Sequence, residues 1–329
     1  MTISQYAVAS DTGRKRRRNE DNYVVAPPLF AVADGMGGAQ AGEVASKLAA
    51  STLESGDDQP LRGVERVAAL IQAANRRVFE RAASDPTASG MGTTMTVALV
   101  EGMHVAIGHV GDSRAYLVRG ERMEQLTDDH SLVNELLKSG KLSPEEALAH
   151  PQRSVITRAV GTDPDVDIDA FTIEAEDGDV FLICSDGLTD MVEDVDILEV
   201  LEQHKEDLDR AVKSLVAAAN RGGGEDNITA VAFRVAAEGD GGETMQMPAA
   251  EEPNEDTQEQ VEAHPSVDTM VIPPERIDQE LLEPGSPEAL AAARQDGEPF
   301  DASARLRLVL TMVGLLGIAV VLLVWGLLR

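Results

Sequence analysis

Five short acidic sequences are the part of this chain with the clearest chemical potential. They are Asn19-Glu20-Asp21, Ala33-Asp34-Gly35, Gly111-Asp112-Ser113, Ser185-Asp186-Gly187 and Glu225-Asp226-Asn227. The first four stand where a predicted strand ends or a turn begins, and the fifth directly precedes the last predicted strand. Carboxylates at strand ends converge on one rim of a sheet, which is the arrangement that a hard divalent cation needs. The set therefore predicts a divalent-metal site capable of metal-assisted hydrolysis.

The glycines after Asp34 and Asp186 add a second feature to two of these sequences. Glycine lets the backbone turn sharply, and it would let a carbonyl oxygen approach an ion closely. A single Asp-Gly pair is more typical of a plain turn than of a metal site. The prediction therefore depends on the whole set.

A basic run at residues 14–18 stands directly before Asn19-Glu20-Asp21 in an otherwise acidic chain. An arginine in this run could hold two phosphate oxygens with the fork of its guanidinium group. The alternative for Lys15, Arg17 and Arg18 is a solvated basic loop or a patch that faces a membrane.

Short apolar runs and amphipathic periodicity predict the elements that position these residues. Strands are expected at 29–33, 94–100, 104–110, 115–118 and 181–184. Apolar residues recur with helical spacing at 41–53, 64–78 and 208–219. Strands grouped together, with helices before, between and after them, predict an α+β fold with an antiparallel sheet.

In their order and context these sequences resemble the metal-dependent type 2C protein Ser/Thr phosphatases, also called the PPM family. The matching blocks are Arg16-Arg17-Arg18-Asn19-Glu20-Asp21, Val32-Ala33-Asp34-Gly35-Met36-Gly37-Gly38, Gly92-Thr93-Thr94, Gly111-Asp112-Ser113-Arg114, Ser185-Asp186-Gly187-Leu188 and Glu225-Asp226-Asn227-Ile228-Thr229. Six blocks in the family's order make a chance match improbable. The resemblance implies a four-layer α-β-β-α sandwich with two central antiparallel sheets.

The resemblance also implies roles for the acidic residues. Asp34 would bridge two Mn²⁺ or Mg²⁺ ions, and Asp21 would orient water from behind the ligands. The implied ligands are Glu20, Asp34, the Gly35 carbonyl, Asp186 and Asp226, with Asp112 and Asp186 at a third, weaker site. Two bridged ions lower the pKa of a shared water, and the hydroxide would attack phosphoserine or phosphothreonine on a protein substrate.

Two other positions of the family pattern bear on catalysis. Arg16 occupies the position that binds the substrate phosphate. Met36 stands where eukaryotic members carry a histidine that has been assigned as general acid, and bacterial-type members resemble this chain in having methionine there. Methionine cannot donate a proton, so no general acid is assigned.

The segment 128–161 resembles the mobile flap beside the active site of bacterial-type members. His130 and His150 are expected to pack or cap within it and not to bind metal. Residues 165–176 imitate a calcium-binding EF-hand loop, but Ala170 stands where that loop requires glycine. The alternation of Val166, Ile168 and Phe171 instead predicts a half-exposed strand.

Composition excludes several function classes. The formal net charge is −30, which argues against nucleic acid as a partner. Cys184 is the single cysteine, so no intrachain disulfide can form, and its apolar neighbours predict a buried thiol. The first residues show no secretory signal.

Composition also divides the chain into three parts. Residues 1–235 form the predicted phosphatase domain, 236–304 a disordered acidic linker, and 305–329 a transmembrane helix whose apolar run covers 308–328. Such a helix would be ~31 Å long, and the arginines before it place the domain in the cytoplasm. The sequence thus predicts a single-pass protein of the cell membrane. Its expected partners are phosphorylated proteins, among them Ser/Thr kinases and their substrates, and the lipid bilayer through residues 308–328.

Two alternatives stay open at this point. The domain could be a non-catalytic phosphatase-like binding module, although every expected ligand is present. In the linker, Glu243-Thr244-Met245 and Asp268-Thr269-Met270 are either phosphorylation sites or part of a plain spacer.

Overall fold

The computed structural model describes residues 2–37, 41–56, 60–148, 150–237 and 270–271. All of these residues lie within one compact unit, Met1–Pro274. The predicted transmembrane helix and nearly all of the predicted linker lie outside the described residues. Within the described ranges, no helix is both long enough and apolar enough to cross a membrane.

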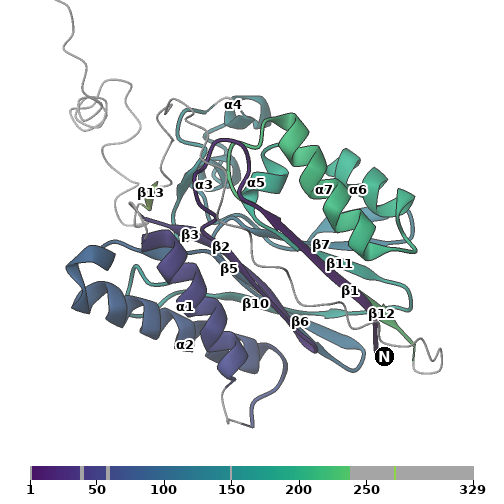
Figure 1. The fold of residues 1–329 in the computed structure, drawn as a ribbon, viewed down its shortest axis with the longest axis horizontal. Helices are drawn as coiled ribbons and strands as arrows, with labels where there is room; N and C mark the ends of the chain where they lie inside the picture. The colour runs from purple at the N-terminus through teal and green to yellow at the C-terminus, as the bar shows by residue number, and fades with distance from the viewer. Residues whose placement is uncertain (1, 38–40, 57–59, 149, 238–269, 272–329) are drawn as a thin grey trace, which may run out of the picture. The chain divides into compact units, whose positions relative to one another are not determined.

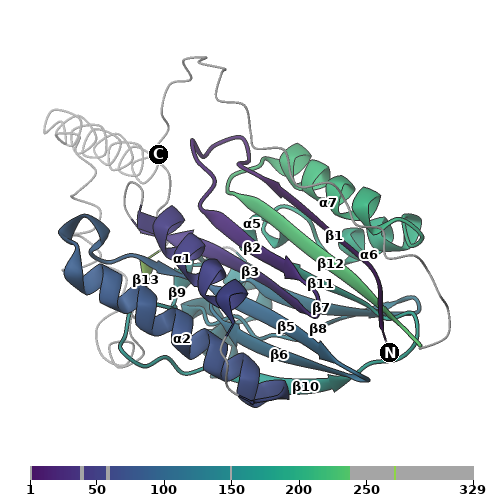
Figure 2. The same ribbon diagram turned by 60° about the horizontal axis from the view of Figure 1, so that its bottom comes forward.

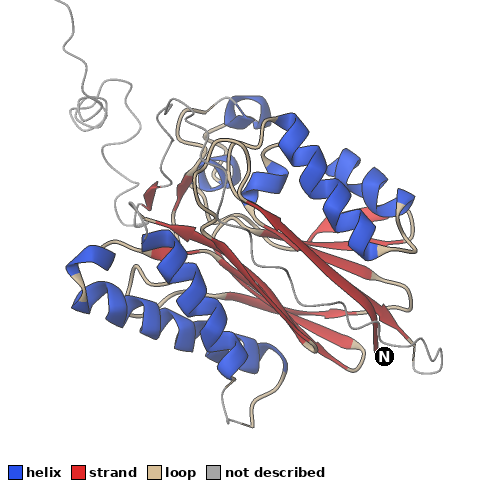
Figure 3. Cartoon of the chain, in the orientation of Figure 1, coloured by secondary structure: helices blue, strands red, loops and turns tan. Residues whose placement is uncertain are grey.

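Two antiparallel sheets form the centre of the first unit (Figures 1 and 3). The first sheet has the strand order β1 (Thr2–Asp11), β12 (Ile228–Ala236), β11 (Val180–Cys184), β7 (Arg114–Arg119) and β8 (Arg122–Gln125). The second has the order β10 (Asp169–Glu174), β6 (His104–Val110), β5 (Met95–Glu101), β3 (Leu29–Met36) and β2 (Asp21–Ala26), and β4 (Gly92–Thr93) also pairs with β3. The fold is therefore α+β, as predicted.

Helices cover the outer face of each sheet (Figure 1). On the second sheet, α1 (Ala41–Ser55) and α2 (Gly63–Ser84) share one apolar cluster with β3, β5 and β6. On the first sheet, α6 (Asp194–Gln203) and α7 (Leu208–Gly222) share another with β7, β11 and β12. Figure 3 shows the resulting order of helix, sheet, sheet and helix. This confirms the four-layer sandwich.

A third apolar cluster fills the space between the sheets. Phe30 from β3 stacks on Phe233 from β12 with ring centroids 4.3 Å apart, and Phe181 from β11 stacks on the same ring at 5.0 Å. All three side chains are almost fully buried. Since aromatic pairs contribute about 0.5–1.5 kcal/mol beyond the burial of their area, these rings help to fix the two sheets face to face.

The helices predicted at 41–53, 64–78 and 208–219 and the strands predicted from apolar runs all appear; the helices are longer than predicted, and the strand ends agree to within a few residues. The clearest case is α7, whose buried residues include Leu208, Val212 and Leu215 at helical spacing. The Asp207 side chain accepts a hydrogen bond from the Arg210 N–H at 3.0 Å and so caps the helix. Cys184 lies buried in β11 as a free thiol, as expected.

The remaining short elements lie in the connections between the longer ones (Figures 1 and 2). They are 3₁₀ helix η1 (Pro86–Ala88), α3 (Leu132–Lys138), α4 (Pro144–Leu148), β9 (Val155–Ile156) and α5 (Asp186–Thr189). The flap, residues 128–161, contains α3, α4 and β9. It is joined to the second sheet by an exchange of backbone hydrogen bonds between Thr93 and Val160, at 3.0 and 2.8 Å.

Several features differ from the sequence prediction. The strands β1, β2 and β8 and the helix α6 were not predicted, and β1 alternates too weakly to be recognised. The strand expected to include Val166 and Ile168 begins only at Asp169, because the Val166 carbonyl is taken by the Gln72 side chain at 2.6 Å instead of by a neighbouring strand. Within the segment predicted to be structureless, β13 (Met270–Val271) pairs in parallel with β9 (Figure 2).

Candidate active site

The loop that carries the basic run is fixed against the loop that carries Asp226. Gly13 adopts φ +78°, which turns the chain so that the Arg14 N–H donates to the Gly224 carbonyl at 2.7 Å. A β-carbon at Gly13 would lie 2.1 Å from the Asp226 carbonyl oxygen. Glycine is therefore required where the two loops cross, and the crossing brings the start and the end of the domain together.

Asn227 holds the acidic residue of the first block in place. Its side-chain amide donates to the carbonyls of Thr12 and Arg18 at 2.9 and 2.8 Å, and its Oδ1 accepts from the Glu20 N–H at 2.7 Å. The side chain is buried, so these bonds are shielded from water. Asn227 belongs to the last of the matching sequence blocks, but its residue type alone does not predict this positioning role.

Asp34 lies at the end of β3, where two threonines fix its backbone. Its N–H donates to the Thr94 hydroxyl at 3.0 Å, and its carbonyl accepts from the Thr93 hydroxyl at 2.7 Å and from the Thr94 N–H at 2.8 Å. The Thr94 hydroxyl also lies 2.7 Å from the hydroxyl of Ser113, the residue after Asp112. The Gly92-Thr93-Thr94 block thus links the turns that carry Asp34 and Asp112.

Gly35 lies against Gly42 at the start of α1. A β-carbon on Gly35 would come within 2.2 Å of the Gly42 carbonyl oxygen and 2.6 Å of the Glu20 carbonyl oxygen. The Gly35 N–H donates to that same Glu20 carbonyl at 3.2 Å. A β-carbon on Gly42 would lie 2.7 Å from the Glu20 carboxylate. These two glycines allow Glu20 to approach the turn after Asp34.

Asp21 and Asp186 each have one buried carboxylate oxygen without a hydrogen-bond partner among the described residues. These oxygens are Asp21 Oδ1 and Asp186 Oδ1, whereas Ser185 donates its hydroxyl to Asp21 Oδ2 at 2.8 Å. A buried polar atom without a partner costs about 1–3 kcal/mol, and more when it is charged. The fold therefore leaves two buried oxygen acceptors available to a cation or to a hydrogen-bond donor.

Burial and mutual repulsion raise the pKa values of the clustered carboxyl groups. Burial raises the pKa of Asp34 and of Asp186 well above the usual range, and the negative charges of other cluster members add to both shifts. Burial likewise raises the pKa of Asp21 to about 6 and that of Asp112 to about 7. The cluster therefore resists being fully ionised unless positive charge is supplied.

Part of that positive charge comes from Arg16. Its guanidinium donates to Asp226 Oδ2 at 2.7 Å, and the negative charges of Asp226, Asp34 and Glu20 all raise its pKa against the opposing effect of burial. Asp226 Oδ1 accepts from the Asn227 N–H at 2.8 Å. Arg16 and Asp226 are therefore paired at the rim of the acidic cluster.

A small polar pocket collects most of the predicted site residues. It is lined by Arg16, Glu20, Asp34, Gly35, Met36, Gly37 and Asp226. Met36 is nearly buried and packs against Ile156 and Ala159 of the flap. The position of the missing histidine is therefore filled by an apolar contact with the flap.

Asp112 lies in the turn between β6 and β7, where Gly111 has φ +112°. The charges of Asp129 and Asp190 contribute to its raised pKa, and Asp112 in turn contributes to that of Asp186. The nearby Arg114 is committed to Asp129 by two hydrogen bonds of 2.9 and 2.7 Å. Asp112 therefore interacts electrostatically with Asp186.

The carboxylates are close enough to repel one another, but they do not form a complete metal-coordination site. In the described part of the chain, no three His, Cys, Asp or Glu side chains lie in an arrangement that could hold a metal ion as it stands. Repulsion between like charges and the pairing of Asp226 with Arg16 both favour this spread arrangement. Small side-chain movements would be needed to close it around an ion.

The two flap histidines form the packing and capping contacts that the sequence predicted. His130 is buried, its Nδ1 accepts from the Gly111 N–H at 3.1 Å, and its Nε2 lies 3.1 Å from Asp169. His150 Nδ1 accepts from the Gln152 N–H at 3.2 Å, which is a capping contact. Asp169 also forms an ion pair with Arg158 of the flap at 2.8 Å. Since its carboxylate is bonded to two flap residues, the structure does not support the calcium-loop alternative.

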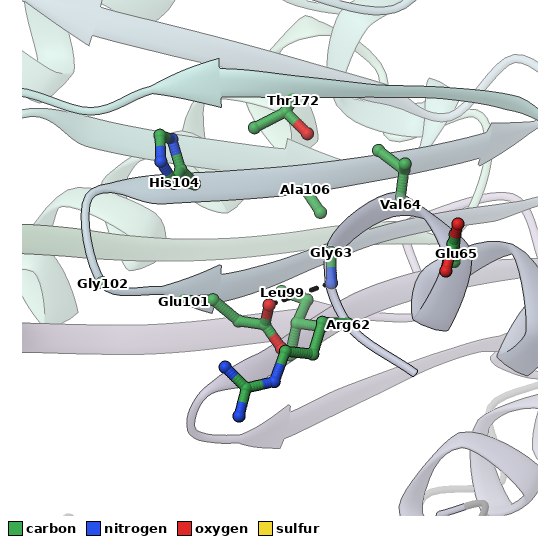
Figure 4. Close-up of a pocket in the computed structure, with 10 residues that line it drawn as sticks. All are labelled: Arg62, Gly63, Val64, Glu65, Leu99, Glu101, Gly102, His104, Ala106 and Thr172. Atoms are coloured by element: carbon green, nitrogen blue, oxygen red, sulfur yellow. Dashed lines mark hydrogen bonds between the residues drawn. The ribbon is translucent and has the colours of Figure 1, made fainter. Parts of the chain in front are cut away.

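A larger pocket of the molecule lies elsewhere (Figure 4). It is formed by the first turn of α2 and the hairpin between β5 and β6, where Glu101 accepts a hydrogen bond from the Gly63 N–H at 2.9 Å. Met95 and Val110 form the opposite end of that strand pair, next to the Asp34 and Asp112 turns. The larger pocket is therefore separate from the acidic cluster.

Comparison with known proteins agrees with the predicted family. The sequence profile described as Protein phosphatase 2C matches residues 14–227. The Serine/threonine phosphatase stp of Listeria innocua is 40% identical over 231 residues, which cover 67% of this chain and 91% of that protein.

Solved structures give the same result. The serine/threonine phosphatase PstP/Ppp of Mycobacterium tuberculosis is 40% identical, with a TM-score of 0.67 over 71% of this chain and 99% of that one. A structure of the PstP catalytic domain in complex with 2 manganese ions is 38% identical, with a TM-score of 0.64 over 71% and 98% of the two chains. This chain belongs to the protein phosphatase 2C family and is a protein serine/threonine phosphatase.

Proposed function

We propose that this phosphatase is a Mn²⁺- or Mg²⁺-dependent enzyme that removes phosphate from phosphoserine and phosphothreonine of cytoplasmic proteins and so opposes Ser/Thr kinases. The observation that supports the metal dependence most strongly is the pair of buried, unpartnered carboxylate oxygens on Asp21 and Asp186. They belong to a cluster whose pKa values are raised by burial and repulsion. Oxygen donors that need positive charge fit a hard divalent cation.

The proposed ligands follow from this arrangement and from the family pattern. Asp34 would bridge two ions, with Asp186 and Asp226 on one of them and Glu20 with the Gly35 carbonyl on the other. Asp112 and Asp186 are grouped where a third ion would bind. When bound, such ions supply an activated water and neutralise charge on the phosphate.

The chain's own groups would orient the substrate. Arg16 pairs with Asp226 at 2.7 Å, and it is half-exposed at the rim of the small pocket. We expect Arg16 to leave Asp226 and hold the substrate phosphate once Asp226 binds an ion. Asp21, fixed by the Ser185 hydroxyl, can accept a proton from a water molecule beside the ligands.

The proposal includes membrane attachment. It rests on the apolar run at 308–328 and on the arginines that precede it, all of which lie outside the described residues. A cytoplasmic domain on an acidic linker would reach substrates near the inner membrane surface. Membrane-associated kinases and their substrates are the corresponding partners, and nucleic acid is not expected.

The test is hydrolysis of p-nitrophenyl phosphate and of a phosphothreonine peptide by the full-length chain, with Mn²⁺ and with EDTA. We expect Mn²⁺-dependent rates in the wild type and a loss of at least a hundredfold in Asp34→Asn and Asp186→Asn, on the order of the effect of removing a catalytic electrostatic group. Asp165→Asn is the matched control, because Asp165 is exposed on the loop before β10. Rates that are equal in all variants, or that survive EDTA, would refute the proposal.

A further inference from the structure

The flap carries a strand edge that is already occupied by another part of the chain. In β9, Ile156 forms an antiparallel bridge with Ser131, and the Thr157 N–H donates to the His130 carbonyl at 2.7 Å. Along β9, Met270 pairs with Val155 and Val271 pairs with Ile156, in parallel. β9 is thus paired with a neighbouring flap segment and with a strand that comes from far along the sequence.

The sequence around β13 occurs twice. Residues 243–248 read Glu-Thr-Met-Gln-Met-Pro and residues 268–273 read Asp-Thr-Met-Val-Ile-Pro, so both have the form acid-Thr-Met-x-(Met or Ile)-Pro. Each copy is a short apolar stretch bounded by an acid and by a proline. Proline has no N–H and ends strand pairing, so the pattern suits a strand of two or three residues.

Strand addition explains why such a sequence would pair with β9. An exposed strand edge offers unpaired N–H and C=O groups, and an extended peptide can satisfy them with its own backbone. About 33 residues separate Met270 from the end of β12, and a flexible linker of that length spans roughly 30 Å. At such a distance the tethered copy is present at an effective concentration on the order of millimolar.

The edge is next to the acidic pocket. Ile156 is fully buried and packs against Met36 and Ala159, and Met36 lines the pocket together with Arg16 and Asp34. A peptide paired with β9 therefore touches the strand whose side chain supports one wall of that pocket. The contact is independent of which metal or substrate the pocket takes.

We infer that the edge of β9 is a peptide-docking site for the acid-Thr-Met-x-(Met or Ile)-Pro motif, and that its occupant is the copy at 268–273 of the same chain. The copy at 243–248 has the same pattern and can replace it. The linker is then a tethered ligand of the flap as well as a spacer.

The test is backbone hydrogen exchange of the full-length chain in mild detergent. Val271→Pro combined with Gln246→Pro changes the same position in both copies, because proline fixes the backbone angle φ outside the usual strand range and has no N–H. We expect the amide of Ile156 to exchange about threefold faster or more in this variant, whereas the amide of Val155, which donates to the Gln152 carbonyl at 3.2 Å, should not change. The matched control is Val261→Pro with Gln258→Pro, which makes the same exchanges between the copies and should leave the flap unchanged. Equal exchange in the test and control variants would overturn the inference.

A binding measurement gives an independent result. A labelled peptide of residues 264–275 should bind the double variant about tenfold more tightly than the wild type, whose edge is filled by the tethered copy. The same peptide with Val271→Pro should not bind. Failure of the unmodified peptide to bind the double variant would contradict a docking site on β9.

A dilution series separates binding within one chain from binding between chains. If the occupant comes from the same molecule, exchange at Ile156 in the wild type stays constant over a twentyfold dilution. Faster exchange on dilution would show that the occupant comes from a second copy and would overturn the assignment.

Discussion

At the scale of single residues, the site depends on glycines as much as on acids. Gly35 allows the Glu20 carbonyl and the Gly42 carbonyl to approach the turn after Asp34, within distances that a β-carbon would violate. The sequence indicated that the glycine after Asp34 mattered for a sharp turn. It could not show that the close neighbours would be Glu20 and Gly42, since that contact forms only when β2, β3 and α1 pack together.

Replacement of Gly35 tests this packing. Gly35→Ala should lower the free energy of unfolding by about 2 kcal/mol or more, because overpacking against backbone atoms cannot be relieved by a change of rotamer. The control is Gly120→Ala, where the backbone has φ +59° but no atom lies nearby, so the cost should be about 1 kcal/mol. Urea unfolding of both variants measures the difference, and a Gly35→Ala cost no larger than the control would contradict the packing argument.

Arg16 provides a second prediction at this scale. Arg16→Lys keeps the charge but loses the planar fork, so KM for a phosphothreonine peptide should rise about tenfold, with a smaller change in kcat. Arg17→Lys, at a neighbouring exposed position, should leave KM unchanged. Steady-state kinetics measures both effects, and an unaltered KM in Arg16→Lys would contradict a role for Arg16 in binding the substrate phosphate.

At the scale of elements, the sequence predicted the strands and helices with strong periodicity and missed those defined by long-range pairing. The apolar runs became β3, β5, β6, β7 and β11, whereas β1 is recognisable mainly through its pairing with β12. β13 has only two residues and a partner more than a hundred positions away. Local patterning cannot report such partners, and the same holds for the crossing of Gly13 with Asp226.

The flap joins β5 and β6 through a buried pair of histidines. His109 Nδ1 lies 2.9 Å from the Thr96 hydroxyl and its Nε2 lies 3.2 Å from the Asp128 carbonyl, while its ring lies 4.6 Å from that of His130. Burial lowers the pKa of His109 to about 3, and the charge of His130 adds to this effect. His109 is therefore neutral in the folded chain at neutral pH.

The lowered pKa gives a signed prediction. The unfolded chain gains a proton at His109 near pH 6.5 and the folded chain does not, so the stability present above pH 6.5 is lost as the pH falls toward 3. Between pH 7 and pH 5 the free energy of unfolding should fall by about 2 kcal/mol more in the wild type than in His109→Gln. His104→Gln, at the exposed start of β6, should behave as the wild type. If the free energy of unfolding, measured with urea, changed with pH in the same way in the wild type and in His109→Gln, the claim that His109 stays neutral in the folded chain would be refuted.

At the scale of the whole molecule, the acidic cluster couples stability to pH and to metal. The six sequence blocks predicted which carboxylates would meet at one end of the sandwich, because their order matches a known family. They did not predict that Arg16 would pair with Asp226 or that Asn227 would hold the Glu20 backbone. Those contacts depend on loops from opposite ends of the domain.

The raised pKa values predict how the metal-free enzyme responds to pH. Asp112, with a pKa of about 7, and Asp34 and Asp186, with pKa values well above the usual range, stay protonated in the fold at a pH where the unfolded chain has lost these protons. This contribution to stability is lost as the pH rises through the folded pKa values. Saturating Mn²⁺ should therefore raise the melting temperature more at pH 8 than at pH 6.

Differential scanning fluorimetry at the two pH values, with and without Mn²⁺, measures this effect. Asp112→Asn should make the metal-free chain more stable at pH 8, since it removes one of the repelling charges. Asp165→Asn should not. The same Mn²⁺-induced shift at both pH values would show that proton release from the cluster is not linked to metal binding.

The central claim is that Asp34 joins two ions within this cluster. The most direct measurement is calorimetric titration of the metal-free, full-length chain with Mn²⁺, comparing the wild type with Asp34→Asn and with the exposed control Asp165→Asn. The account predicts two tightly bound ions and a weaker third in the wild type and the control, and loss of both tight ions in Asp34→Asn. Unchanged stoichiometry and affinity in Asp34→Asn would contradict it.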